Sequence, residues 1–167
     1  MDKLTIERIQ LLHPKLRKEA AEIYAEICAA LTGRAMCRFS YTLRTFAEQD
    51  TLYAKGRTAP GGIVTKARGG LSYHNYGLAV DIVLIVDADG DGKHEKAAWD
   101  QKSDFDKDGR ADWMEVVTIF KQHGWTWGGD WKFADGPHFE KTFGYSVRQL
   151  LSLHKLQKVG PGGYVKI

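Results

Sequence analysis

The spacing of apolar and polar residues predicts helices at the beginning of the chain. Residues 1–33 carry apolar positions at helical spacing, with a break near Pro14 and a stop at Gly33. A proline interrupts a helix because it has no amide hydrogen and its ring clashes with the preceding turn. We therefore expect two helices in this segment, which together cap a sheet formed by later residues.

Extended and helical patterns follow in alternation. Residues 37–43 are a β-like run, and residues 79–86, AVDIVLIV, are almost continuously apolar and β-branched. Helical spacing returns in residues 45–56 and 116–124, and again after Gly144 in a terminal helix with a loose tail. The pattern predicts an α+β fold, with a small antiparallel sheet and helices packed on one of its sides.

Length and composition fit one domain. The chain has 167 residues and no Pro- or Ser-rich linker, so we expect a single domain over residues 1–167. The net charge of +3 is small and the basic residues are dispersed, which gives little support to nucleic-acid binding. The two cysteines, Cys28 and Cys37, are expected to be buried thiols, although their spacing also allows a bridge.

Two short segments far apart in the chain carry a candidate zinc site. Residues 72–81, SYHNYGLAVD, offer the imidazole of His74 and the carboxylate of Asp81, and residues 136–139, GPHF, offer His138. Three such ligands are the set that a catalytic zinc takes while its fourth position stays open for water. A single histidine is more often a hydrogen-bonded loop or core residue. The combination, with a glycine turn in one segment and a proline turn in the other, favours zinc.

The first of these segments resembles SxHxxGxAxD, the signature of zinc peptidases that cut peptidoglycan stem peptides at or beside D-amino acids. The family includes VanX- and VanY-like D-Ala-D-Ala carboxypeptidases and the L-alanyl-D-glutamate peptidases of phage endolysins and bacterial cell-wall hydrolases. Its second motif, an acid three residues before a histidine with a proline between, is similar to residues 135–138, and its arginine-bearing segment is similar to residues 43–57. The matching positions are Ser72, His74, Gly77, Ala79, Asp81, Asp135, Pro137, His138, Arg44, Gln49, Leu52, Tyr53, Gly56 and Arg57.

The resemblance implies roles for individual side chains. Asp135 would be the general base that takes a proton from zinc-activated water and delivers it to the departing amine, where the plain alternative is a turn-capping aspartate. Arg44 would grip a carboxylate or the developing oxyanion, where the alternative is a surface arginine. Substrate contacts are expected from Ser72, Gln49 and Trp131, while at least two of the three tryptophans in GWTWGGDWKF are expected to fill the core.

A second metal signature lies between the two halves of the zinc site. Residues 104–115, DFDKDGRADWME, place oxygen side chains at positions one, three, five, nine and twelve of a loop with glycine at six, as an EF-hand calcium loop requires. The expected ligands are Asp104, Asp106, Asp108, Asp112 and Glu115, with the backbone carbonyl of Arg110. We expect a calcium loop grafted into the domain as an acidic insertion over residues 87–115, rather than a paired EF-hand domain.

An upstream run begins in the same way. Asp87, Asp89, Asp91 and Gly92 follow the loop pattern, but Ala98 stands where the bidentate glutamate belongs, so this is half a site or a solvated turn. Because the insertion separates Asp81 from the second histidine motif, calcium is hypothesised to order the wall that carries the catalytic turn and so to control activity.

Together these features favour a zinc peptidase that hydrolyses the L-alanyl-D-glutamate bond of stem peptides. Aspartate rather than glutamate at position 135 is typical of that branch of the family. A D-alanyl-D-alanine carboxypeptidase or dipeptidase shares the same ligands and stays open. Different in kind is a non-catalytic calcium-binding cell-wall module, against which the presence of Asp135 and Arg44 argues.

The start of the chain bears on where the protein would act. Residues 1–20 lack both a basic n-region and an uninterrupted apolar h-region, and no run in the chain is long enough to span a membrane. The expectation is a monomeric cytoplasmic enzyme that reaches the cell wall after lysis or through a phage holin. A pI near 8.8 is compatible with approach to an anionic wall.

Overall fold

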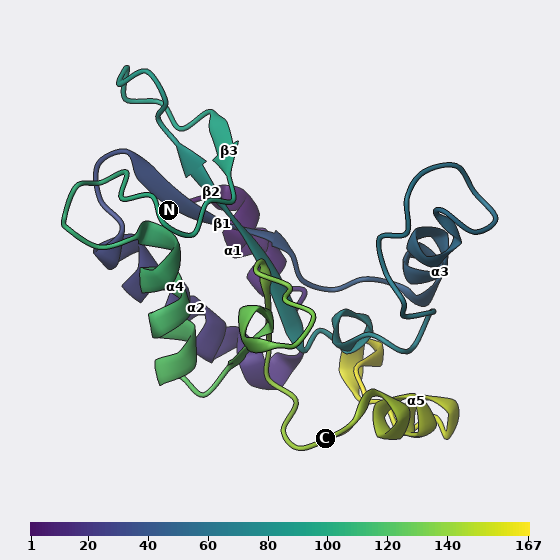
Figure 1. Cartoon of the computed structure of the whole chain (residues 1–167). Helices are drawn as coiled ribbons and strands as arrows, with labels where there is room; N and C mark the ends of the chain where they lie inside the picture. The colour runs from purple at the N-terminus through teal and green to yellow at the C-terminus, as the bar shows by residue number, and fades with distance from the viewer.

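The computed structural model describes all residues, 1–167. Helices and strands alternate along the chain, and short 3-10 turns connect several of them (Figure 1). The elements are α1 (Lys3–Ile9), α2 (Pro14–Ala30), β1 (Ala35–Tyr41), α3 (Phe46–Ala54), η1 (Tyr73–Tyr76), β2 (Ala79–Val86), β3 (Lys96–Ala98), α4 (Asp112–Gln122), β4 (Thr126–Trp127), η2 (Gly128–Asp130), β5 (His138–Glu140), α5 (Val147–Lys155) and η3 (Pro161–Gly163).

The predicted break at Pro14 is confirmed, and the two N-terminal helices have different positions. Pro14 is the first residue of α2, where its missing amide hydrogen costs no helical bond. Helix α1 lies along the outer edge of β1, where the hydroxyl of Thr5 accepts a hydrogen bond from the Phe39 amide and Arg8 donates to the Phe39 carbonyl. These bonds satisfy backbone groups that an edge strand would otherwise leave open.

The sheet is antiparallel, in the order β1-β2-β5-β4, with β3 also paired to β2. Strand β2 matches the predicted run 79–86 residue for residue and lies at the centre. Its side chains alternate between the two faces, since Val80, Ile82 and Leu84 belong to the hydrophobic core while Asp81 points the other way. One face of the sheet therefore packs in the hydrophobic core, and Asp81 makes the opposite face polar at its own position.

Helices α2 and α4 cover the apolar face (Figure 1). The fully buried Phe120 of α4 stacks on Phe139 of β5, with ring centroids 4.2 Å apart and an interplanar angle of 20°. Rings of this size bury large apolar areas, which is the main stabilising contribution to such a core. The expectation of helices packed on one side of the sheet describes α2 and α4, while helices α3 and α5 lie beyond one end of β2 (Figure 1).

The C-terminal tail differs from the loose end expected from its glycines and proline. Val165 is buried and pairs with Val159 in an isolated bridge, and its carbonyl lies 2.9 Å from Nε2 of His13. The hydroxyl of Tyr164 donates to the carbonyl of Leu11 at 2.9 Å. These contacts fasten the last residues to the connection between α1 and α2.

The cysteines and the lengths of the helices complete the description of the fold. Cys28 and Cys37 are free thiols, the first half-buried and the second buried. Among the helices, none combines the length and the apolar composition that crossing a bilayer requires.

Candidate metal centre and active site

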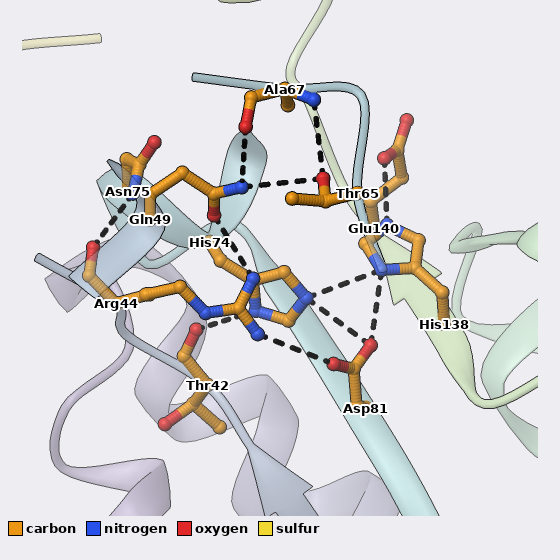
Figure 2. A network of polar contacts seen from close by, with 10 residues as sticks. All are labelled: Thr42, Arg44, Gln49, Thr65, Ala67, His74, Asn75, Asp81, His138 and Glu140. Atoms are coloured by element: carbon orange, nitrogen blue, oxygen red, sulfur yellow. Dashed lines mark hydrogen bonds and ion pairs between the residues drawn. The ribbon is translucent and has the colours of Figure 1, made fainter. Parts of the chain in front are cut away.

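Three side chains from different elements meet on the polar face of the sheet (Figure 2). His74 comes from the short turn η1, Asp81 from β2 and His138 from the first position of β5. The antiparallel register pairs Asp81 directly with His138, so their side chains project from the same face of neighbouring strands. In the sequence, only the motifs indicated that these three residues meet. The pairing of β2 with β5 gives the physical reason why Asp81 and His138 lie together.

The ligand atoms of these residues converge on one point. Nε2 of His74 lies 3.2 Å from Oδ1 of Asp81 and 3.2 Å from Nδ1 of His138, and the last two atoms are 3.1 Å apart. The other ring nitrogens face acceptors, since Nδ1 of His74 lies 2.7 Å from the Thr42 carbonyl and Nε2 of His138 lies 2.9 Å from Oε2 of Glu140. Because a carbonyl or a carboxylate only accepts, the protons belong on these outer nitrogens. When both rings are neutral, the inner nitrogens, Nε2 of His74 and Nδ1 of His138, then carry free lone pairs.

The cluster is electrostatically coupled. Burial alone would raise the pKa of Asp81, but hydrogen bonds and charge from His138 and His74 hold it well below its ordinary value. Burial would lower the pKa of His138, but Asp81 and Glu140 together raise it to about 9. The pair of carboxylates thus stabilises positive charge at this position, as expected where a cation is to be bound.

The turn that carries His74 depends on Gly77 and Asn75. Gly77 ends the turn in the left-handed region at φ +67°, and an added Cβ would lie 2.6 Å from the backbone nitrogen of His13. Oδ1 of Asn75 accepts from the amides of Gly70 and Ser72, at 2.9 and 3.3 Å. Ser72, expected to contact substrate, is thus at the beginning of the turn and part of its local bonding.

Arg44 lies at the predicted strand-to-helix junction, between β1 and α3. Its Nη2 is 3.8 Å from Oδ2 of Asp81, and the guanidinium lies over the Tyr41 ring at 4.4 Å. Its Nη1 donates to Oε1 of Gln49 at 3.0 Å (Figure 2). Arg44 therefore holds a fixed positive charge beside the three converging side chains.

The expected substrate contact from Gln49 is wrong. This side chain is fully buried, with no solvent-exposed surface, and its amide nitrogen donates to the Ala67 carbonyl at 2.9 Å. Both ends of the amide are therefore occupied inside the protein. Gln49 instead orients Arg44 and fastens the loop between α3 and η1.

Asp135 lies in the loop that leads from η2 into β5 and is exposed to solvent. Its amide donates to the Gly128 carbonyl at 2.9 Å, and its own carbonyl accepts from the His138 amide at 3.2 Å. Partial burial and, to a smaller extent, the negative charge of Asp81 raise the pKa of the Asp135 carboxyl. A carboxyl that takes up protons more readily than usual thus lies in the turn next to His138.

The tryptophans around this turn divide as the sequence predicts. Trp125 and Trp127 are buried in the core, and Nε1 of Trp127 donates to the Gly136 carbonyl at 2.6 Å. Trp131 remains 38% exposed, with its ring centroid 5.2 Å from that of His138. Trp131 thus forms a wall beside the cluster of His74, Asp81 and His138.

The acidic loop 104–115 brings its oxygen side chains into two overlapping groups. Oxygen atoms of Asp104, Asp106 and Asp108 lie within 4.8 Å of one another, as do those of Asp106, Asp112 and Glu115. Oδ1 of Asp112 and Oε2 of Glu115 are buried without a hydrogen-bond partner. Desolvation and the neighbouring carboxylates raise the pKa of both Asp112 and Glu115. Such uncompensated carboxylate oxygens are unfavourable in a folded protein unless a cation joins them.

The same loop has the backbone turn that the pattern predicts. Gly109 adopts φ +95°, and its amide donates to Oδ2 of Asp104 at 2.9 Å. The amide of Arg110 donates to Oδ1 of Asp108, and the Arg110 guanidinium lies 4.0 Å from Glu115. Helix α4 begins inside the loop at its ninth position, as an exit helix should.

In the upstream acidic loop, the third carboxylate does not come from the twelfth position of the EF-hand pattern. Ala98 belongs to β3, and Glu95 instead brings a carboxylate oxygen within 4.8 Å of those of Asp87 and Asp89. The Asp87 carboxylate accepts from the amides of Gly90 and Gly92. These bonds account for the local turn without a ligand.

Comparison with known proteins identifies relatives of the chain. Residues 65–141 match a peptidase M15 family described as D-alanyl-D-alanine carboxypeptidase. The chain is 45% identical over 130 residues to the peptidoglycan L-alanyl-D-glutamate endopeptidase CwlK of Bacillus subtilis (strain 168), a match that covers 77% of this chain and 72% of that protein. The crystal structure of the Serratia marcescens L-Ala D-Glu endopeptidase ChiX has a similar fold, with a TM-score of 0.54 and 22% identity over 86% of this chain and 90% of that one.

Proposed function

Because this chain belongs to the M15 peptidase family, we propose that it hydrolyses the bond between L-alanine and D-glutamate in the stem peptides of peptidoglycan. The observation that carries the proposal is the convergence of Nε2 of His74, Nδ1 of His138 and Oδ1 of Asp81 within 3.2 Å of one another. The relative that is 45% identical over most of its length is named for this bond. That name supports the choice of bond.

The three residues fit zinc. Ligand atoms 2.0–2.1 Å from a tetrahedral zinc stand about 3.3 Å apart, close to the spacing of these three atoms. Two imidazoles and a carboxylate form a donor set that suits zinc and leaves a fourth position open. Thr42 and Glu140 fix the outer nitrogens of His74 and His138, as acceptors around zinc-bound histidines usually do.

Zinc bound here would supply water of lowered pKa and polarise the scissile carbonyl. The proton transfers belong to Asp135, which takes a proton from the attacking water and gives it to the departing amine of D-glutamate. Arg44, fixed by Gln49, stabilises the negative charge that develops on the carbonyl oxygen or binds a carboxylate of the substrate.

Trp131 and the exposed Phe133 form one rim of this site. Phe133 is 76% exposed, and the ammonium of Lys66 lies 4.8 Å from the centroid of its ring. Lys66 belongs to the loop after α3, so this contact joins the two loops that flank the metal ligands. The proposal includes substrate contacts from Trp131 and from Ser72, which lies at the beginning of the η1 turn.

A second function has one specific observation in its favour. The matching family is described as D-alanyl-D-alanine carboxypeptidase, an activity that uses the same ligand set on a free C-terminus. Arg44 would then bind the terminal carboxylate of the substrate, a task for which a guanidinium is well suited. The two functions differ in products and not in metal chemistry.

We also propose that the loop 104–115 binds calcium. The ligands would be Asp104, Asp106, Asp108, Asp112 and Glu115, with the Arg110 carbonyl. The unpartnered buried oxygens of Asp112 and Glu115 support this assignment, because only oxygen ligands at the ninth and twelfth positions complete such a site. Calcium at this loop would neutralise repelling carboxylates and stabilise the N-terminus of α4.

Mass spectrometry of purified muropeptides incubated with zinc-loaded protein tests the proposed function. Release of stem peptides that begin with D-glutamate, leaving L-alanine behind, is the expected result. Release of terminal D-alanine would favour the carboxypeptidase instead. Intact substrate with and without calcium would contradict both and favour a non-catalytic wall-binding protein.

A further inference from the structure

A cavity of about 510 Å³ lies between the two acidic loops. Its walls include Asp87 and Ala88 from the upstream loop, Asp104 and Phe105 from the downstream loop, and Trp99, which follows β3. A cavity of this size falls in the range that encloses a small ligand. None of these residues belongs to the His74–Asp81–His138 cluster or to the family motifs, while Asp104 is also one of the proposed calcium ligands.

The cavity has an exposed aromatic surface. Trp99 is 59% exposed, the most exposed of the five tryptophans in the chain. An indole ring that stays mostly in water contributes little to the free energy of folding, because little of its apolar surface is buried. The tryptophans in the core supply that contribution instead. Its flat face is available to pack against a ligand that has a flat apolar side.

The charged groups around the cavity are balanced in sign. Three basic and three acidic side chains line it, namely Arg34, Lys96, Lys107, Asp87, Asp100 and Asp104. A site for a polyanion would show one dominant positive sign. Mixed hydrogen-bond donors and acceptors around one aromatic face suit a neutral ligand that is rich in hydroxyl and amide groups.

Both loops that wall the cavity are tied to the region between α2 and β1. Arg34 donates from Nε to the Asp87 carbonyl at 2.9 Å and from Nη2 to the Ala88 carbonyl at 2.7 Å. Oδ2 of Asp106 accepts from the Thr32 amide at 2.9 Å. These bonds hold the cavity in a formed state, which lowers the cost of ordering it around a ligand.

The segment that follows Trp99 reaches the turn that carries the proposed general base. Gln101 lies two residues after Trp99, and a Cβ added to Gly136 would be 2.4 Å from its Nε2. The side chain of Gln101 therefore packs directly on the turn between Asp135 and His138. Two residues of extended chain reach about 7 Å at most, so the backbone of Trp99 lies within that distance of a residue whose side chain packs on the catalytic turn.

We propose that this cavity binds a sugar ring of the glycan strand that carries the stem peptide, with Trp99 as the platform. This inference rests on the proposed function, because the L-alanine of a stem peptide is joined to a sugar of the strand. The sugar then lies next to the scissile bond on its N-terminal side. The C–H groups on one face of a pyranose pack against the negative face of the indole, and the polar side chains bind its hydroxyl and acetamido groups.

The test compares two substrates with the same peptide. One is a stem peptide linked to its disaccharide, and the other is the identical peptide without sugar. Trp99→Ala should lower kcat/KM for the sugar-linked substrate about tenfold and leave the sugar-free peptide within about twofold. Trp99→Phe, which keeps an aromatic face, should retain most of the activity. Phe143→Ala, a change to another partly exposed aromatic residue, is the control and should alter neither substrate.

Calorimetric titration with the disaccharide alone separates this inference from the proposed function. Wild-type protein should bind the disaccharide, and Trp99→Ala should bind it about tenfold more weakly. Equal effects of Trp99→Ala on both substrates, or disaccharide binding that is unchanged in this variant, would overturn the glycan site while leaving the peptidase intact. Failure of the wild type to cleave either substrate would overturn the peptidase, and disaccharide binding would still decide the cavity's role.

Discussion

The ring of Phe120 stacks on the ring of Phe139 at 4.2 Å, and this contact connects the two candidate metal sites. Phe139 lies between His138 and Glu140 in β5, and Phe120 lies on α4, whose first turn contains Asp112 and Glu115. Phe120 lies eight positions after Asp112 along the helix, a rise of about 12 Å. Helix α4 therefore joins the acidic loop, at its first turn, to the strand that carries His138.

Calcium should stabilise the protein, and Glu115→Gln should abolish the effect. At a free calcium concentration 100-fold above Kd, binding to the folded state alone contributes about 2.7 kcal/mol. For a chain of this size that raises Tm by about 5–10 °C. Differential scanning calorimetry in calcium and in excess EGTA measures the shift. Asp89→Asn, in the upstream loop, is the matched control and should keep it.

The calcium effect should depend on pH. Without calcium, the pKa values of Asp112 and Glu115 are raised in the folded state, so the folded protein binds more protons than the unfolded chain and loses stability as pH rises through these pKa values. Calcium removes this penalty, so its Tm shift should be larger at pH 7 than at pH 5. A shift of equal size in Glu115→Gln and wild type would place calcium elsewhere.

Asp135→Asn should separate catalysis from metal binding. The amide keeps the shape of the side chain but cannot take a proton, so kcat should fall by a factor of about 10²–10⁴. Zinc content, measured by atomic absorption after dialysis, should match that of the wild type because Asp135 is not one of the three converging ligands. Near-normal turnover by this variant would assign the proton transfer to another group.

Glu140 is predicted to act through His138. Glu140→Ala removes the acceptor that fixes the proton on Nε2, and zinc affinity should weaken about 10- to 100-fold. Glu140→Gln retains an acceptor oxygen and should recover most of that affinity. Competition with a chromophoric chelator measures the zinc Kd directly and needs no activity. Unchanged zinc affinity in Glu140→Ala would reduce this residue to a structural part of the strand.

Much of this site could be predicted from sequence, because its residues are in contiguous motifs. The run AVDIVLIV gives β2 with its bounds, and SxHxxGxAxD selects His74 and Asp81. Glu140 was also within reach, because residues two apart in a strand share a face and HFE places an acid two residues after His138. Its role went unrecognised because the motif ends at the histidine.

Other parts of the site had no local signal. Thr42 acts through its backbone carbonyl, which every residue has, so nothing in its side chain marks it. Gln49 matches the family segment whether it faces the substrate or the core, and only its complete burial decides between them. The tail was expected to be loose because its glycines and proline break regular structure. It is held by a contact between His13 and Val165, which are 152 positions apart, and sequence periodicity cannot predict such a contact.

Asp2 should make stability fall at acid pH. Burial raises its pKa, but hydrogen bonds from Arg38 and Thr5 outweigh this and leave the folded-state pKa below the ordinary value of about 3.8. A depressed carboxyl pKa stabilises the fold above the unfolded value, and this contribution disappears as pH falls through the folded one. Asp2→Asn should cost about 0.5–1.5 kcal/mol at pH 7, and the difference should shrink as pH falls below 3.8 and through the folded-state pKa. Denaturant titrations at pH values above and below 3.8 follow this convergence.

Gly77→Ala should damage both the fold and the metal site, and Gly33→Ala offers a matched control. Both glycines have left-handed φ values, +67° and +58°, so both substitutions carry the backbone cost of about 1–2 kcal/mol. Only at Gly77 does the added Cβ meet backbone, 2.6 Å from the nitrogen of His13, whereas no atom lies within 4 Å at Gly33. The clash adds about 1–3 kcal/mol and displaces the turn that carries His74. Gly77→Ala should therefore lower Tm more than Gly33→Ala and weaken zinc binding, while Gly33→Ala keeps wild-type zinc affinity. Equal losses of Tm with intact zinc binding in both variants would mean that the η1 turn absorbs the clash without moving its histidine.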